Sequence, residues 1–202
     1  MARTIDPAER AHLLKAGTVV MRRNGFAGAN ITEILAEAGI STRAFYRHFR
    51  SKDDLLLAIF RQNADLTGER LEQRLAGAAT PTDQLVAWID EILDMGYDPR
   101  RARVSRVFAA GTVTPAIANA GHEAAARLSA PLHDVLSSGA ASGEFPDCDP
   151  ATDAASIHAL VWRLFTDAMH GRARLDRKQA MQHILRFVAP ALGVDRVALP
   201  RA

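Results

Sequence analysis

Apolar residues recur every three or four positions along most of the chain, and runs that alternate with the period of a strand are nearly absent. This spacing places the apolar side chains on one side of a helix. Capping residues precede many of these runs, with proline at the first helical position, as in Asp6-Pro7, Thr80-Pro81 and Asp149-Pro150. The pattern predicts an all-α protein of about nine helices.

The same signals predict where helices begin and end. Asp6 is expected to cap the first helix with Glu9 as its reciprocal partner, and Gly25 to close that helix in the left-handed conformation. The first clear break comes at 77–80, so a helix over 52–76 connects the two sides of the chain. We therefore expect two domains, 1–52 and 77–202, joined by that helix.

Residues 30–49 have the length and turn of a helix-turn-helix. Two short helices are joined through Gly39-Ile40-Ser41, where the glycine permits a tight turn. Phe45 and Phe49 are four positions apart and are expected to face inward. The other residues of the second helix are predicted to be exposed: Thr42, Arg43, Ala44, Tyr46, Arg47 and His48. Polar side chains of this kind bind phosphates and base edges in a major groove, although the outer face of an ordinary bundle helix is polar as well.

Charge is distributed unevenly along the chain. Residues 1–52 carry 9 basic and 4 acidic side chains (+5), residues 53–202 carry 16 and 19 (−3), and the sum is the net charge of +2. A basic head on an acidic body favours a polyanion such as nucleic acid as the partner of the head. An excess of five charges also arises by chance on ordinary surfaces.

Composition excludes several classes of protein. With 48% hydrophobic and 24% charged residues, the chain has neither a disordered nor a collagen-like composition. Its one cysteine, Cys148, cannot form an internal disulfide, and no apolar run approaches the roughly 18 residues of a membrane span. The N-terminal residues lack the apolar segment of a secretory signal. We expect a soluble, cytoplasmic protein that does not contact the membrane.

The chain lacks the sequence motifs of common enzymes. It has no nucleophile elbow, Walker loop, dinucleotide-binding glycine run or His-Glu-x-x-His motif. No two of its seven histidines are three or four positions apart, so no helix offers a pair of histidine metal ligands. We expect no enzymatic activity, no metal and no cofactor. An all-α adaptor, or an all-α enzyme that does not act on DNA, is the alternative.

Three consecutive segments resemble the N-terminal domain of the tetracycline-repressor (TetR) family of transcriptional regulators. They are Leu13-Leu14-Lys15-Ala16 with Met21 and Asn24-Gly25-Phe26; then Asn30-Ile31-Thr32-Glu33-Ile34 with Ala38-Gly39-Ile40-Ser41; and, most diagnostic, Phe45-Tyr46-Arg47-His48-Phe49-Arg50-Ser51-Lys52-Asp53-Asp54-Leu55-Leu56. The resemblance covers about residues 8–60. Gly17 and Met21 stand where the family usually has alanine and phenylalanine, so we expect the first helix to pack a little loosely.

The resemblance implies DNA-binding roles for nine residues. Tyr46 and Lys52 match positions that grip phosphates. Thr42, Arg43, Ala44 and His48 match positions that enter the major groove, and Arg43 is best suited to a guanine edge. Asn30 caps the second helix, Thr32 lies beside it, and Arg47 reaches either a phosphate or only solvent.

In this family the remaining helices form a sensor and dimerisation domain, which the resemblance places over 77–202. Apolar stripes on the last two helices favour a four-helix bundle between two subunits, with contacts from Ile157, Leu160, Leu164, Met181, Ile184, Leu185 and Val188. The competing interpretation is that these residues pack only within the monomer. An effector cavity is expected among Trp88, Met95, Tyr97, Phe108, His122, His158, Trp162, Phe165 and Met169, with plain core as the alternative.

These expectations describe a homodimeric regulator that binds double-stranded DNA in a sequence-specific way. We expect the regulator to be a repressor that binds a palindromic operator and is released from it by a small, mostly apolar effector. The effector would act by favouring a conformation in which the two DNA-binding heads are wrongly spaced.

Overall fold

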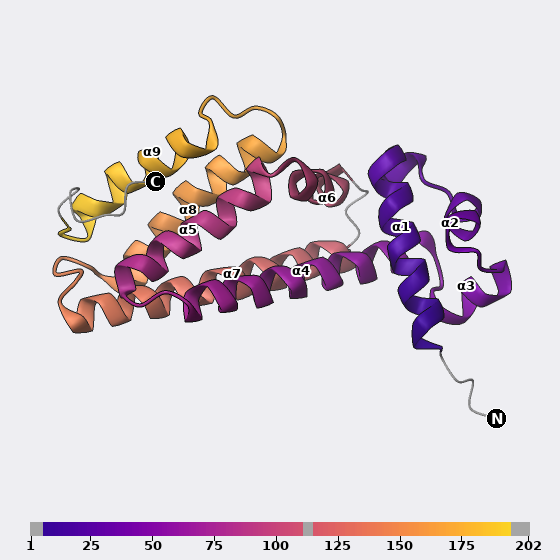
Figure 1. Cartoon of the computed structure of the whole chain (residues 1–202), viewed down its shortest axis with the longest axis horizontal. Helices are drawn as coiled ribbons and strands as arrows, with labels where there is room; N and C mark the ends of the chain where they lie inside the picture. Colours follow the sequence, from indigo (N-terminus) through magenta and orange to yellow (C-terminus); the bar gives the residue numbers. More distant parts are fainter. Residues whose placement is uncertain (1–5, 111–114, 195–202) are drawn as a thin grey trace. The chain divides into compact units, whose positions relative to one another are not determined.

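The computed structural model of the chain describes residues 6–110 and 115–194, and within these ranges it contains nine helices and no strand (Figure 1). The predicted all-α fold is confirmed. The helices are α1 (Pro7–Gly28), α2 (Ile31–Ala38), α3 (Thr42–His48), α4 (Lys52–Ala76), α5 (Pro81–Tyr97), α6 (Pro99–Ala110), α7 (Pro115–Ser142), α8 (Pro150–Met169) and α9 (Arg177–Ala191). Asp6, Thr80 and Asp149 cap their helices by accepting a hydrogen bond from a backbone N–H, as predicted.

The helices are divided between two compact units. The first contains the described residues up to Asp65 together with Arg106–Glu123, and the second contains Leu66–Ser105 and the described residues from Ala124 onward. Helices α4, α6 and α7 therefore contribute to both units. This division differs from the predicted one, which ended the first domain at residue 52 and placed all of 77–202 in the second.

The core of the first unit is built from α1, α2, α3 and the start of α4. Leu13, Val20, Ile34, Phe45 and Leu55 are fully buried there. Each occupies the apolar side of its helix, so burial of these sides determines how the short helices pack.

The turn between α2 and α3 has the predicted form. Gly39 ends α2 in the left-handed conformation, with φ 65°, and the Ile40 N–H donates to the Leu35 carbonyl at 3.1 Å. Ser41 then caps α3 by accepting a hydrogen bond from a backbone N–H. The prediction for Gly25 was only partly right. Helix α1 is interrupted there, but φ 71° and ψ 170° lie outside the left-handed helical region, and helical residues follow to Gly28.

Helix α1 packs closely on α4, contrary to the expected loose packing. A β-carbon at Gly17 would lie 2.9 Å from side-chain atoms of both Leu55 and Ile59. Met21 is also buried in this core. The expectation fails because the missing side chain at Gly17 lets the two helices approach each other.

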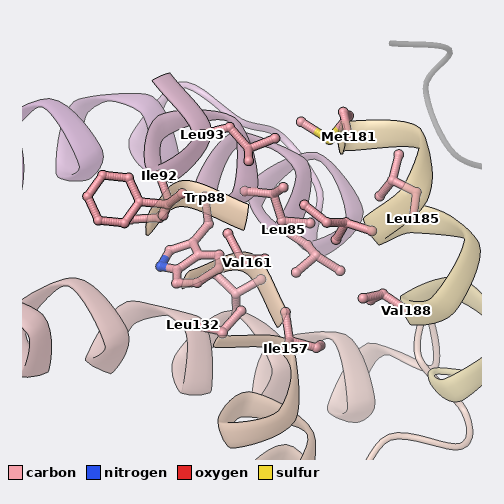
Figure 2. Close-up of a cluster of buried hydrophobic side chains, with 14 of the residues drawn as sticks. Leu85, Trp88, Ile92, Leu93, Leu132, Ile157, Val161, Met181, Leu185 and Val188 are labelled. Carbon is pink, nitrogen blue, oxygen red and sulfur yellow. The ribbon is translucent and has the colours of Figure 1, made fainter. Parts of the chain in front are cut away.

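In the second unit, α5 packs against α8 and α9, and the core forms where their apolar sides meet (Figure 2). Trp88 of α5 is fully buried, and its Nε1–H donates to the Leu128 carbonyl of α7 at 2.7 Å. Gly96 permits the close approach of α5 and α8, because a β-carbon there would lie 2.7 Å from the Phe165 carbonyl oxygen.

Candidate nucleic-acid interface

Two aromatic side chains hold α3 in the first unit. Phe45 is 0% exposed and Phe49 is 3% exposed, and their ring centroids are 5.9 Å apart. Tyr46 projects outward, with 54% of its surface exposed, and its ring lies edge-on to Phe45 at 5.3 Å. The buried pair therefore decides which side of α3 faces solvent, as the sequence predicted.

Six of the nine predicted DNA-binding residues are exposed: Asn30, Thr32, Thr42, Arg43, Tyr46 and Arg47. Asn30 caps α2, as predicted, by accepting a hydrogen bond from the Glu33 N–H at 2.8 Å. Arg43 forms no ion pair among the described residues, so its guanidinium is available to a phosphate or a base edge.

Two residues predicted to enter the major groove are buried instead. Ala44 is 3% exposed, and the side chain of His48 is 0% exposed. Positions 44, 45, 48 and 49 form one continuous side of a helix, so both residues share the buried side with Phe45 and Phe49. The prediction for Ala44 and His48 does not hold in this structure.

Glu9, in the first turn of α1, binds the two basic residues at the end of α3. Its carboxylate accepts hydrogen bonds from one guanidinium nitrogen of Arg47 at 2.7 and 2.9 Å and lies 3.0 Å from Nε2 of His48. The Arg47 bond, followed by the His48 bond, lowers the pKa of Glu9. Glu9 therefore faces α3 instead of acting as the reciprocal partner of Asp6, which was its predicted role.

Lys52 lies at the first position of α4. Its Nζ donates to the carbonyl of Ala29 at 2.8 Å, next to the residue that caps α2. This bond brings a positive charge to the N-terminal end of α2, where a phosphate would also meet backbone N–H groups. A phosphate contact from Lys52 stays a prediction.

The residues predicted to line an effector cavity do not form one group. Trp88, Phe165 and Met169 are buried in the core of the second unit, while Met95, Tyr97, His158 and Trp162 are partly buried in the same unit. The Tyr97 hydroxyl donates to the Leu175 carbonyl at 3.1 Å. His122 is exposed and belongs to the first unit, and the side chain of Phe108 lies outside the described part of the structure.

His158 differs from the other candidates because it carries an unsatisfied polar atom. Its ring stacks on Trp162 at a centroid distance of 5.3 Å and lies 6.3 Å from that of Trp88. Nε2 is buried and has no hydrogen-bond partner in the described structure, and burial lowers the pKa of the ring. The site is thus a neutral imidazole between aromatic rings, with one polar atom left to satisfy.

Most of the residues predicted at a dimer interface are buried within the single chain. The core around α5 contains Ile157, Met181, Leu185 and Val188 (Figure 2). Ile184 belongs to the same core, and all five side chains are at most 8% exposed. The competing interpretation, packing within the monomer, fits these five, because a buried side chain cannot contact a second subunit. Leu160 and Leu164 are only partly buried.

A large apolar side chain on α9 that the sequence analysis did not single out is exposed to solvent. Phe187 is 56% exposed, the guanidinium of Arg186 lies over its ring at 5.1 Å, and the ring of His183 meets it edge-on at 5.0 Å. It lies on the outer side of the helix, away from the buried stripe.

A buried carboxylate in the second unit was not predicted from the sequence. Glu91 of α5 is 0% exposed and lies between Arg74 of α4, at 3.0 Å, and Arg101 of α6, at 2.5 Å. Its position three residues after Trp88 places it on the apolar side of α5, which is the signal that could have revealed it.

Cys148 is the one cysteine of the chain, and its thiol is poorly reactive. Burial, and secondarily the Asp153 carboxylate, raises the pKa of Cys148 to about 11, so the thiol is protonated at neutral pH. Across the described ranges no cluster of His, Cys, Asp and Glu could hold a metal ion. In the same ranges no helix combines the length and the apolar character needed to cross a bilayer.

Two family models match the chain. Residues 13–59 match the model of bacterial regulatory proteins of the tetR family, and residues 81–193 match the C-terminal domain of BetI-type transcriptional repressors. The chain belongs to the tetR family. The resemblance seen in the sequence is confirmed, and α2 and α3 are the helix-turn-helix of this family.

Curated relatives of the tetR-family chain match it over part of its length. The fatty acid metabolism regulator protein of Bacillus subtilis is 25% identical over 79 residues, which are 39% of this chain and 41% of the relative. The transcriptional repressor NemR of Escherichia coli K12 is 29% identical over 86 residues, or 42% of this chain and 43% of NemR. The chain therefore matches less than half the length of these relatives.

Solved structures share the fold over nearly the whole chain. FadR of Bacillus subtilis in complex with stearoyl-CoA superposes with a TM-score of 0.72 at 19% identity, over 90% of this chain and 98% of that one. A regulator from Saccharomonospora viridis in complex with choline gives 0.78 at 24% identity, over 91% and 96%. At these identities the likeness establishes the fold, including the helical second unit.

Proposed function

We propose that this tetR-family chain is a transcriptional repressor that binds a palindromic operator as a homodimer and leaves it when a small effector binds. As such, it acts on DNA in the cytoplasm and has no enzymatic activity. The observation that carries the proposal is the exposed outer side of α3, the recognition helix, held in a helix-turn-helix by Phe45 and Phe49.

The exposed residues divide into two roles at the DNA. Arg43 and Thr42, in the first turn of α3, have the chemistry to contact base edges, and a bidentate Arg43–guanine contact is worth about 1–3 kcal/mol of discrimination. Tyr46, Lys52 and the N-terminus of α2 at Asn30 have the chemistry to contact phosphates.

The experiment that tests this function is selection of a duplex from a random 30-bp library, followed by fluorescence anisotropy at several salt concentrations. The selected duplex should bind tightly in the presence of unrelated competitor DNA, with a strong dependence on salt. Arg43→Ala should weaken binding and relax the preference at one base pair of each half-site, whereas Arg61→Ala, an exposed arginine further along α4, should change binding little. A chain that binds no duplex at low salt would instead support the adaptor or enzyme alternative.

The homodimer is proposed on the outer sides of α8 and α9. Phe187 is an exposed aromatic side chain of the kind that anchors interfaces, and Leu160 and Leu164 of α8 are partly exposed. Sedimentation of Phe187→Asp should give a monomer, and Leu66→Asp, an equally drastic change at an exposed leucine of α4, should give the wild-type assembly. A dimeric Phe187→Asp variant would place the interface elsewhere.

The effector is proposed to bind beside His158 in the second unit. The rings of Trp162 and Trp88 favour an apolar or flat ligand, and the unpartnered Nε2 favours one that carries a hydrogen-bonding group. The stearoyl-CoA of the FadR structure and the choline of the Saccharomonospora viridis structure both combine apolar and polar parts. Ligands of this kind should quench tryptophan fluorescence and release the operator, and Trp162→Ala should abolish both responses.

A further inference from the structure

The carboxylate of Glu9 holds both basic residues at the C-terminal end of the recognition helix. Arg47 keeps 36% of its side chain exposed, but one guanidinium nitrogen donates to both Glu9 oxygens. The side chain of His48 is fully buried. A carboxylate only accepts hydrogen bonds, so Nε2 of His48 must be the donor in this pair, and Nδ1 is left as a buried nitrogen without a partner in the described structure.

This arrangement ties α3 to α1 across 38 residues of sequence. Charge-assisted hydrogen bonds to one carboxylate are stronger and shorter than neutral ones. Loss of Glu9 would leave the Nε2–H of the buried His48 side chain without its acceptor, and an unsatisfied buried donor is costly. Glu9 therefore fixes the orientation of the helix end as well as the direction of Arg47.

A phosphate and the Glu9 carboxylate compete for the same guanidinium. Both are oxyanions that an arginine binds through N–H groups. A DNA phosphate that approached Arg47 would also approach the negative charge of Glu9, at 2.7 Å from the same nitrogen, and like charges at short range repel. The carboxylate thus occupies one nitrogen at which the guanidinium could bind a phosphate, and its charge opposes a phosphate at the others.

We propose that Glu9 is a positioning residue that acts as an internal substitute for a DNA phosphate: it withholds Arg47 from DNA and holds the end of α3 on α1. The inference rests on the proposed DNA-binding function. It follows that contacts with DNA come from the first part of α3, where Arg43 and Tyr46 are exposed, and that Arg47 adds nothing to the salt dependence of binding.

The test is the slope of log Kobs against log salt concentration on the duplex selected from the random library. Each phosphate contact contributes about −0.9 to this slope. Arg47→Ala should leave the wild-type slope unchanged. Glu9→Gln, which removes the charge and keeps the size, should steepen it by about 0.9 for each head that contacts DNA, and adding Arg47→Ala to Glu9→Gln should restore the wild-type value.

A matched control separates this effect from a general loss of negative charge. Glu37→Gln makes the same change at an exposed carboxylate of α2 and should leave the slope unaltered. A shallower slope for Arg47→Ala, or a steeper slope that persists in the double variant, would overturn the inference while leaving DNA binding intact. A wild-type chain that binds no duplex would overturn the proposed function and this inference with it. Should Glu9→Gln fail to fold, a shallower slope for Arg47→Ala would still overturn the inference.

Discussion

Replacing Glu91 by glutamine tests how much a buried carboxylate contributes to the stability of the second unit. The carboxylate is 0% exposed, whereas its partners Arg74 and Arg101 keep 37% and 19% of their side chains exposed. Oε1 accepts a hydrogen bond from Arg101 at 2.5 Å. Oε2 lies 3.0 Å from Nε of Arg74 but has no hydrogen bond of good geometry, so that contact is a charge attraction without a directed bond.

The magnitude follows from these two contacts. A hydrogen bond between charged groups contributes about 1.5–3 kcal/mol, and the contact with Arg74 adds less because that arginine is more than one-third exposed and screened by water. The glutamine amide would also direct an N–H donor at one of the two guanidinium groups. We expect Glu91→Gln to lower the free energy of unfolding by about 2–4 kcal/mol, which is a decrease in Tm of roughly 4–16 °C for a chain of this size.

The arginine variants should cost less, because each leaves the carboxylate with one partner. In Arg101→Met, Glu91 loses its hydrogen bond but keeps the contact with Arg74, and we expect a loss of about 1.5–3 kcal/mol. In Arg74→Met, Glu91 keeps its hydrogen bond to Arg101. Arg74 also binds Asp90 and Asp94, but both of these carboxylates keep Arg177 as a partner, at 2.5 and 2.7 Å. The order of the costs therefore follows from how many of its own partners the buried Glu91 site loses, because Asp90 and Asp94 keep Arg177.

Urea and thermal unfolding at one fixed protein concentration measure these differences. Glu72→Gln is the matched control, because Glu72 is 64% exposed and pairs with Arg127 at 3.4 Å on the surface of the same unit, where such a pair contributes about 0–1 kcal/mol. A free energy of unfolding for Glu91→Gln within 0.5 kcal/mol of the wild type, or a larger loss in Arg101→Met than in Glu91→Gln, would refute this account of the buried carboxylate.

Three further predictions concern single residues. Burial raises the pKa of Cys148 from an ordinary value of 9.0 to about 11. The thiol should therefore react with iodoacetamide at pH 7 roughly 100-fold more slowly in the folded chain than in urea, and equal rates would contradict its burial. Burial lowers the pKa of His158, so the contribution of this residue to stability is complete above the ordinary pKa of 6.5 and is lost as the pH falls through the lowered pKa of the folded chain. The urea midpoint of the wild type should therefore fall between pH 7.5 and pH 5.0 by more than that of His158→Phe. An equal fall in both proteins would argue against the lowered pKa. Gly96→Ala should lower the free energy of unfolding by about 1–3 kcal/mol because the new methyl group meets the Phe165 carbonyl, whereas Gly121→Ala, which meets nothing within 4 Å, should be neutral or stabilising.

Local signals in the sequence were sufficient to predict the helices and the turn. Caps such as Asn30 and Ser41 act on N–H groups three residues away, and Gly39 acts on its own backbone. The inward direction of Phe45 and Phe49 follows from helical spacing within a single short helix. Each of these features is decided within one turn of the chain, and each is present in the structure.

Features that depend on distant partners were not predictable in this way. Glu9 fits the capping pattern of its own helix, and its actual partners are 38 and 39 residues away. The polar character of His48 predicted exposure, but a carboxylate from another helix made burial possible. The stripe through Ile184 and Val188 was correctly identified as apolar, yet helical spacing alone does not say whether α5 or a second subunit covers it.

The small number of available cations on the recognition helix makes dimerisation a condition of the proposed function. Of the two arginines on α3, Arg47 is bound to Glu9, while Arg43 has no ion pair in the described structure. A single head with so few contacts should bind DNA only weakly, with a Kd of about 10⁻⁵ M. A second head linked to the first is present at an effective concentration of about 1 mM, which tightens binding about 100-fold to roughly 10⁻⁷ M before any sequence-specific gain. Monomeric Phe187→Asp should therefore lose at least that factor on the selected duplex, and a monomer that binds as tightly as the wild type would show that one head is sufficient.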